Sequence, residues 1–366
     1  MARICPTGQN WVSGGKVGQA LGWHRTQHKS IRSVNVIYEL EVFLHDSRVL
    51  RDNPLGDPHI RRVYVLSPKN SQHRSLPLIW MLAGFGGTGA GFLNAGAWHE
   101  SLWDRVNRLA ENGALRDVRI VLPDVVTSVG GSQYVDSSAI GPYDTYLWDE
   151  LYDVLENRFP IGRHGVAGKS SGGFGAWTAV LNHPNKVDAM ASHAGDALFE
   201  WAYWPDFPKA YQTFREEGEP SGFWNKLRVA GEKPSRWKVA INVMAMTAAY
   251  SPNGAVDGRF PADFPLDFDT LAVKPEVWAR WLQHDPLRRL ETAPSREIIK
   301  KLRLCFFDAG TRDEYQLQYA ATRIHQLLNI HDIPHTYEQF AGGHHSTNHR
   351  YDVSLPLLAE ALSKSV

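Results

Sequence analysis

The chain has 366 residues, enough for one large α/β domain with insertions or for two smaller domains. Its 39 Lys and Arg residues balance 39 Asp and Glu residues, and no long run of one sign stands out. This balance argues against a nucleic acid or an anionic membrane surface as the partner. The two cysteines, Cys5 and Cys305, give neither a disulfide framework nor the spacing of a metal site, and they suit a reducing compartment.

The N-terminal residues show no targeting signal. Residues 1–25 carry Gly, Ser and Gln and lack the apolar stretch of a secretory signal. No stretch is long and apolar enough to span a membrane. We therefore expect an irregular segment at 1–30, no membrane span, and a cytoplasmic location.

Alternating strands and helices are predicted along most of the chain. Residues 77–83 form a short, nearly continuous apolar run, which is typical of a central strand covered on both faces, and a glycine-rich turn follows it at 84–87. In chain order, we expect strands at 34–43, 61–66, 77–83, 118–122, directly before Ser170, and at 187–192, 302–307 and 336–340. Helices are expected at 100–112, 143–159, 176–181, 314–328 and 354–362.

This alternation implies an α/β fold with a mainly parallel, doubly wound sheet and helices on both faces. Residues from about 197 to 295 interrupt the alternation, because Pro, Trp and charged residues dominate there and 275–282 is the one strong helix prediction. Six of the chain's 13 tryptophans fall in this segment. We interpret it as a Trp-rich cap inserted between two strands of a domain that spans 31–366.

The most informative motif is Gly168-Lys169-Ser170-Ser171-Gly172, which reads Gly-x-Ser-x-Gly between a predicted strand and a predicted helix. A serine on such a strand-to-helix turn is exposed at the top of a sheet, where it can act as a nucleophile. The glycines suit a sharp turn that brings neighbouring backbone too close for a Cβ atom. Ordinary Gly- and Ser-rich turns also show this pattern, so the interpretation needs partners elsewhere in the chain.

Candidates for those partners lie on two later loops. A serine hydroxyl needs a base to remove its proton and an acid to orient that base. In doubly wound hydrolases these residues follow in the order Ser, acid, His, on loops at the carboxyl edge of the sheet. The chain offers two such loops in that order, each directly after a predicted strand. The candidates are Asp308, Asp313 and Glu314 for the acid, and His344 and His345 for the base.

The oxyanion that forms during acyl transfer needs preorganised N–H donors, each of which contributes about 3–4 kcal/mol. One donor should be the backbone N–H of Ser171, directly after the nucleophile. The other should come from the turn after Ala83, where Phe85 is the first candidate and Gly86 the alternative. We also expect Gly84 and Gly86 to contact the substrate.

Together these stretches resemble the putative-esterase family of α/β-hydrolases, which contains esterase D (S-formylglutathione hydrolase), feruloyl esterases, enterochelin esterases and mycolyltransferases. The resemblance covers roughly residues 60–195 and 300–365. It implies an α/β-hydrolase fold and places the family's triad on Ser170, Asp313 and His344. The residues that carry it are Arg62 to Leu66, Trp80 to Gly87, Glu150-Leu151, Gly168 to Gly173, His183-Pro184, Gly310 to Asp313 and Gly342 to His344.

Ala83 departs from the family's pattern, since relatives have the histidine of a His-Gly pair at this position. The change keeps an N–H donor in the turn, but it leaves the choice between Phe85 and Gly86 open.

The cap has two interpretations. It buries its own aromatic side chains, or it forms an apolar acyl or aryl pocket over the serine. Trp201 and Trp204, just past a strand end, are the cap residues that we expect to face the site.

Other interpretations of these residues are weaker. Residues 165–170 faintly resemble a phosphate-binding loop, but Arg163 stands where that loop needs a glycine. Lys169 flanks the nucleophile and is expected to be exposed or paired with an acid. A metal cluster is a further alternative, made of His344, His345, His349 and Asp352. Its spacing does not match a helical His pair with an intervening Glu, so we expect neither a metal nor another cofactor.

The sequence therefore predicts a serine carboxylic-ester hydrolase that acts on a small ester or thioester through a covalent acyl-enzyme. An acyltransferase or a peptidase with the same triad is an alternative, and a non-catalytic scaffold used for binding is another. A homodimer is expected by analogy alone.

Overall fold

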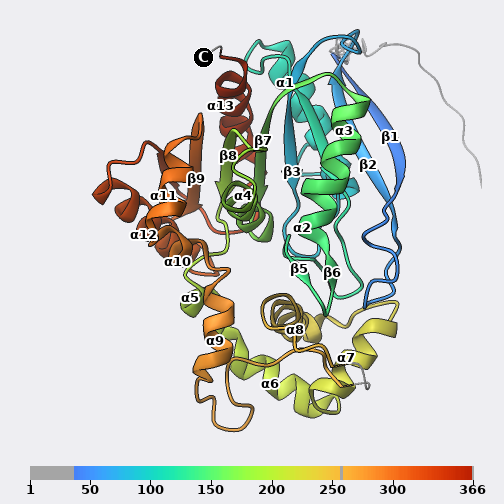
Figure 1. Cartoon of the computed structure of the whole chain (residues 1–366), viewed down its shortest axis with the longest axis vertical. Coiled ribbons are helices and arrows are strands. Elements are labelled where there is room, and N and C mark those ends of the chain that lie inside the picture. The colour runs from blue at the N-terminus through green and yellow to red at the C-terminus, as the bar shows by residue number, and fades with distance from the viewer. Residues whose placement is uncertain (1–36, 256–258, 365–366) are drawn as a thin grey trace, which may run out of the picture. The chain divides into compact units, whose positions relative to one another are not determined.

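An eight-stranded sheet organises the structure, a computed structural model that describes residues 37–255 and 259–364 (Figure 1). In spatial order its strands are β1 (Tyr38–Asp46), β2 (Ile60–Pro68), β4 (Arg119–Pro123), β3 (Leu76–Leu82), β7 (Ile161–Lys169), β8 (Ala189–His193), β9 (Leu304–Gly310) and β10 (Thr336–Phe340). β2 pairs antiparallel with β1 and β4, and all later neighbours pair in parallel. The mainly parallel sheet predicted from the sequence is confirmed.

The segment predicted to be irregular at 1–30 lies outside the described residues. All residues that the structure describes belong to a unit that spans Asn35–Val366. Within the described ranges, no helix is both long enough and apolar enough to cross a membrane.

Helices cover both faces of the sheet. They are α1 (Leu102–Glu111), α2 (Tyr143–Thr145), α3 (Tyr152–Arg158), α4 (Ser171–Asn182), α12 (Leu317–Ile330) and α13 (Tyr351–Ser363), with a π-helical stretch at Tyr146–Leu151 and a small hairpin of β5 (Asp136–Ser137) and β6 (Gly141–Pro142). On one face, α1 and α13 pack on strand residues such as Ile79 and Ala167. On the other face, α3, α4 and α12 pack near Trp80 and Phe307. Burial from both sides explains why the central strands are continuous apolar runs.

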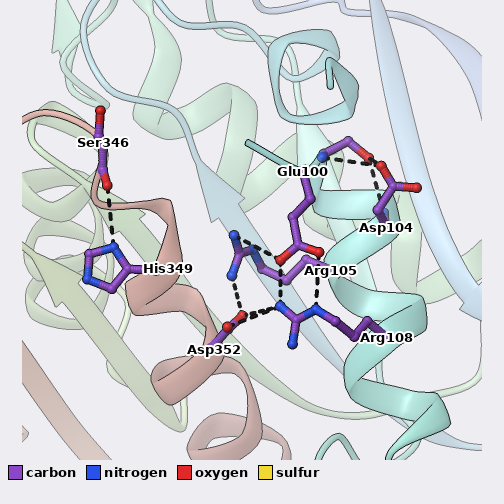
Figure 2. Close-up of polar contacts among 8 residues, drawn as sticks. Glu100, Asp104, Arg105, Arg108, Ser346, His349 and Asp352 are labelled. Carbon is purple, nitrogen blue, oxygen red and sulfur yellow. Dashed lines mark hydrogen bonds and ion pairs between the residues drawn. The ribbon is translucent and has the colours of Figure 1, made fainter. Parts of the chain in front are cut away.

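An ion-pair cluster joins α1 to α13 (Figure 2). Arg105 and Arg108 of α1 both bind Asp352 in the first turn of α13, and both also bind Glu100 just ahead of α1. The cluster holds two cations and two anions, so its charges cancel.

Between β8 and β9 the chain leaves the sheet and forms the insertion, most of which lies beyond one end of the strands in Figure 1. Its helices are α5 (Phe199–Tyr203), α6 (Phe207–Glu216), α7 (Glu219–Val229), α8 (Lys238–Tyr250), α9 (Pro275–Leu282), α10 (Pro286–Leu290) and α11 (Ala293–Lys300). The helix predicted at 275–282 is confirmed as α9, whereas the other six helices had no strong prediction from the sequence. Pro208 and Pro220, which suggested loops, lie in the first turns of α6 and α7, where a proline needs no N–H partner.

The tryptophans of the cap pack mainly against other aromatic side chains of the cap. The ring centroid of Trp281 lies 5.1 Å from that of Tyr250 and 5.6 Å from that of Tyr203. Trp204 and Trp278 are 5.2 Å apart. Such aromatic pairs contribute about 0.5–1.5 kcal/mol each beyond their buried area. The cap therefore has an aromatic core, as the first of its two interpretations predicts.

Glu217, between α6 and α7, joins three side chains of the cap. Its carboxylate accepts hydrogen bonds from the indole Nε1 of Trp237 at 2.9 Å, from Lys226 at 3.0 Å and from Arg236 at 2.5 Å. These bonds stabilise the charged form and lower the pKa of Glu217 to about 2.

Replacing Glu217 with Gln should destabilise the protein at neutral pH, because the neutral amide cannot accept the same charged hydrogen bonds. Because the pKa of Glu217 is lowered in the folded state, its ionised carboxylate stabilises that state fully at pH values above the ordinary pKa of 4.5. This stabilisation is lost as the pH falls towards 2. The difference in free energy of unfolding between wild type and Glu217→Gln should therefore shrink over that range, as measured by urea unfolding. The exposed neighbour Glu216→Gln is the control. A difference that stays constant from about pH 5 to pH 3 would contradict this assignment.

Candidate active site

Ser170 occupies the turn between β7 and α4 in a strained conformation. Its φ of 57° and ψ of −127° are rare for a residue with a side chain, and such strain is common at functional turns. The glycines of the motif leave room for this turn. A Cβ atom on Gly168 would lie 2.3 Å from the carbonyl carbon of Gly172, and one on Gly172 would lie 2.0 Å from the carbonyl oxygen of Leu82.

Asp313 and His344 form a hydrogen-bonded pair on the loops that follow β9 and β10. Nδ1 of His344 lies 2.8 Å from Oδ2 of Asp313, and both side chains are buried. The other carboxylate oxygen of Asp313 accepts the backbone N–H of Tyr315 at 2.9 Å. In the part of the chain that the structure describes, Nε2 of His344 has no hydrogen-bond partner, so this nitrogen is free to exchange a proton with a ligand.

Close backbone contacts hold these two loops together. A Cβ atom on Gly310 would lie only 2.6 Å from the carbonyl oxygen of Gly342. The carboxylate of Glu314 accepts the backbone N–H of His344 at 2.5 Å, and this bond lowers the pKa of Glu314. Asp313 therefore holds the ring of His344, while Glu314 holds its backbone.

The helix predicted at 314–328 begins later, at Leu317. Gln316, directly ahead of it, adopts a left-handed conformation with a φ of 64° and separates the helix from the loop. Asp313 is therefore not the N-cap residue of this helix.

Asp308, another acid candidate, binds a different histidine. Its Oδ1 lies 2.8 Å from Nδ1 of His193, and its Oδ2 accepts a hydrogen bond from Nε of Arg350 at 2.7 Å. Nε2 of His193 lies 2.8 Å from the hydroxyl of Ser354, and all four side chains are buried. The backbone carbonyl of His193 also accepts the N–H of Ser170 at 2.9 Å. This network supports the turn that carries Ser170.

A cavity of about 460 Å³ brings most of the predicted site residues together. Ser170 and His344 line it, and so do Gly84, Phe85 and Ser171. Most of its other lining side chains are polar. They are Lys169, Asp196, Tyr203, Asp206, Lys238, Asn242, Tyr315 and His345, with Gly87, Ala202, Val239 and Leu317 completing the wall.

Two backbone N–H groups at this cavity, those of Phe85 and Ser171, have no hydrogen-bond acceptor among the described residues. Gly86, the alternative donor, uses its N–H to bind the carbonyl oxygen of Gly130 at 3.2 Å. Gly86 does not line the cavity, so the structure does not place it where we expected it to contact the substrate. Its φ of 74° turns the chain there instead.

Asp196 and Tyr203 are cavity residues that the sequence prediction missed. Oδ2 of Asp196 accepts hydrogen bonds from the hydroxyls of Ser171 at 3.2 Å and Tyr203 at 3.0 Å. Burial raises the pKa of Asp196, although both hydrogen bonds oppose the shift. The position of Asp196 just after β8, at the same sheet edge as the other loops, is the signal that could have identified it.

Trp201 and Trp204 do not line the cavity, so the structure does not place them where we expected them to face the site. Trp201 is 61% exposed, and Trp204 packs against Trp278 inside the cap. Ala202 and Tyr203, which lie between them in the sequence, face the cavity instead. Successive residues of a helix point in different directions, so neighbours in the sequence need not share a surface.

The residues considered as a metal cluster have other partners. His344 binds Asp313, and Nδ1 of His349 lies 3.3 Å from the carbonyl oxygen of Ser346 (Figure 2). Asp352 binds the two arginines of α1. Over residues 37–255 and 259–364, no group of three or more His, Cys, Asp or Glu side chains is placed to hold a metal ion.

Solved structures with this fold have low sequence identity to the chain. A ferulic acid esterase matches with a TM-score of 0.57 and 15% identity, over 89% of this chain and 100% of its own. An S-formylglutathione hydrolase from Agrobacterium tumefaciens matches with a TM-score of 0.53 and 16% identity, over 89% and 96%. Fluorophosphonate-binding serine hydrolase F of Staphylococcus aureus matches with a TM-score of 0.51 and 14% identity, over 90% and 99%. No curated protein matches the chain.

The family model described as putative esterase matches residues 58–356, a span that includes the Ser170 turn, both later loops and the cap. This span is most of the chain, and the solved structures show the α/β-hydrolase fold independently. The chain therefore belongs to the putative esterase family and is an esterase with an α/β-hydrolase fold.

Proposed function

We propose that this esterase is a serine carboxylic-ester hydrolase with a catalytic triad of Ser170, His344 and Asp313. One observation carries the proposal. The strained Ser170, the Asp313-bound His344 and the unpaired N–H groups of Phe85 and Ser171 border a single cavity. Acyl transfer needs these components, namely a nucleophile, an oriented base and donors for an oxyanion.

In the proposed reaction, Nε2 of His344 takes the proton of the Ser170 hydroxyl as Oγ attacks the carbonyl carbon. The carbonyl oxygen gains the negative charge, which the N–H groups of Phe85 and Ser171 stabilise. His344 then protonates the leaving oxygen or sulfur, its bond to carbon breaks, and an acyl-serine remains. Water attacks the acyl-serine by the same steps and releases the acid and the free hydroxyl. No cofactor takes part.

The walls of the cavity, which combine charged and apolar groups, support a small ester or thioester as the substrate. Two lysines, two aspartates and Asn242 line it, and Phe85 is its one phenylalanine. A ferulic acid esterase and an S-formylglutathione hydrolase share this fold, so esters and thioesters are both suitable test substrates. An acyltransferase would use the same residues. An added alcohol acceptor would separate the hydrolase from the acyltransferase, because a transferase forms a new ester in preference to the free acid.

Ser170→Ala and His344→Ala should each lower kcat for 4-nitrophenyl acetate by about 10⁴- to 10⁶-fold, because the members of a triad act as a unit. Nitrophenolate release measures the effect, and a fluorophosphonate probe should label wild type but not Ser170→Ala. The exposed cap serine in Ser235→Ala provides the control, with turnover and labelling expected at wild-type levels. Full turnover by Ser170→Ala would reject the proposal.

Two further variants separate the acid candidates. Asp313→Asn should lower kcat by about 10⁴-fold, since the amide no longer stabilises the charged imidazole of His344. Asp308→Asn should instead lower the free energy of unfolding by about 2 kcal/mol, because the buried Arg350 then keeps only Glu338 of the two carboxylates that bind it, and it should reduce kcat much less. Denaturant unfolding and steady-state kinetics on both proteins test this. The reverse ranking of kcat would assign the acid to Asp308.

A further inference from the structure

Lys169 lies beside the nucleophile without an ion-pair partner. It is the last residue of β7, directly ahead of Ser170, and its side chain is partly buried. Among the described residues, its ammonium makes no hydrogen bond and no ion pair. The carboxylates that act on it electrostatically are Asp313 and Glu314, whose oxygens already bind His344. Burial lowers the pKa of Lys169, although the charges of Asp313 and Glu314 oppose the shift.

Lys169 lines two cavities that share part of their walls. The first is the cavity that contains Ser170, and the second has a volume of about 380 Å³ and lies against α1 and the start of α13. Gly84, Gly87 and Lys169 border both. Lys169 therefore borders both the cavity of the reacting centre and the second cavity.

The charges of the second cavity leave Lys169 uncompensated. Among the residues that line this cavity, Glu100 carries the one carboxylate. Arg105 and Arg108 bind that carboxylate and also bind Asp352, so these four charges cancel (Figure 2). A cation withdrawn from water without a partner is costly, and an anionic ligand would offset that cost.

We propose that Lys169 binds a carboxylate on the alcohol moiety of the substrate, which makes esters of hydroxycarboxylic acids the substrate class. This inference rests on the proposed function. The alcohol oxygen must approach His344 to receive its proton, and Lys169 borders both the cavity that His344 lines and the second cavity. The carboxylate would lie in the second cavity, whose lining does not include the acidic groups Asp196 and Asp206 of the first.

Matched pairs of aryl acetates test the inference. The charged probes are 3- and 4-acetoxybenzoate, and the neutral ones are 3- and 4-acetoxybenzamide, which have similar shapes. For at least one pair, wild type should show a kcat/KM about tenfold or more higher for the charged member, since a hydrogen bond between charged groups contributes at least that much. Lys169→Met and Lys169→Gln should each remove the preference. Lys300→Met, which removes an exposed lysine of α11, should retain it.

The alternative outcomes are distinct. Equal kcat/KM values for both members of both pairs in wild type would overturn the inference, as would a preference that persists in both Lys169 variants. A further pair consists of 4-nitrophenyl hemisuccinate, which has a carboxylate on its acyl side, and neutral 4-nitrophenyl butyrate. If wild type shows a Lys169-dependent preference only for the hemisuccinate of this pair, the anion binds on the acyl side, and the assignment to the alcohol is overturned. Turnover of the neutral benzamides tests the proposed function separately, because that reaction does not involve a substrate carboxylate.

Discussion

The buried carboxylate of Asp308 holds together the segments that carry the site. Its two oxygens bind His193 at the end of β8 and Arg350 just ahead of α13, so one charge connects three stretches of the chain. The backbone carbonyl of the same His193 accepts the N–H of Ser170. Buried charged groups that are fully hydrogen-bonded resist displacement, because any movement leaves one of them unpaired. The backbone of the Ser170 turn is therefore positioned from the interior of the sheet.

This support explains how a strained serine can persist in the fold. A positive φ at a residue with a side chain costs about 1–3 kcal/mol and survives only where the surrounding structure enforces it. Here the close approach of Gly172 to Leu82 and the hydrogen bond to His193 enforce it from two sides. The cap contacts this arrangement through Tyr203, which binds the Asp196 carboxylate that also accepts the hydroxyl of Ser171. Phe199 and Tyr250 of the cap also pack against Phe174 of α4, the helix that begins directly after the nucleophile.

The elements of the site could be predicted from the sequence to the extent that short-range patterns encode them. The Ser170 turn and the loops of Asp313 and His344 each follow a strand, and glycines mark where backbones meet, so local sequence located them. The contact between His193 and Asp308 joins residues 115 positions apart, and no local pattern relates such residues. Apart from α9, the cap helices were missed because contacts between distant aromatic side chains stabilise them, and because prolines occupy the first turns of α6 and α7.

The cap also shows why aromatic composition is a poor guide to the character of a binding cavity. Its large rings need extensive contact area, which they find with one another, whereas Asp206, Lys238 and Asn242 keep their polar groups at the cavity surface. A polar cavity discriminates differently from an apolar one. A protein group that binds a charge or a hydroxyl on the substrate strongly disfavours a substrate without that charge or hydroxyl, because the protein group is then left unpaired. An extra methylene in an apolar pocket, in contrast, changes affinity modestly. On our proposal that Lys169 is such a group, we expect the position of charge on a substrate to matter more to this esterase than the length of its acyl chain.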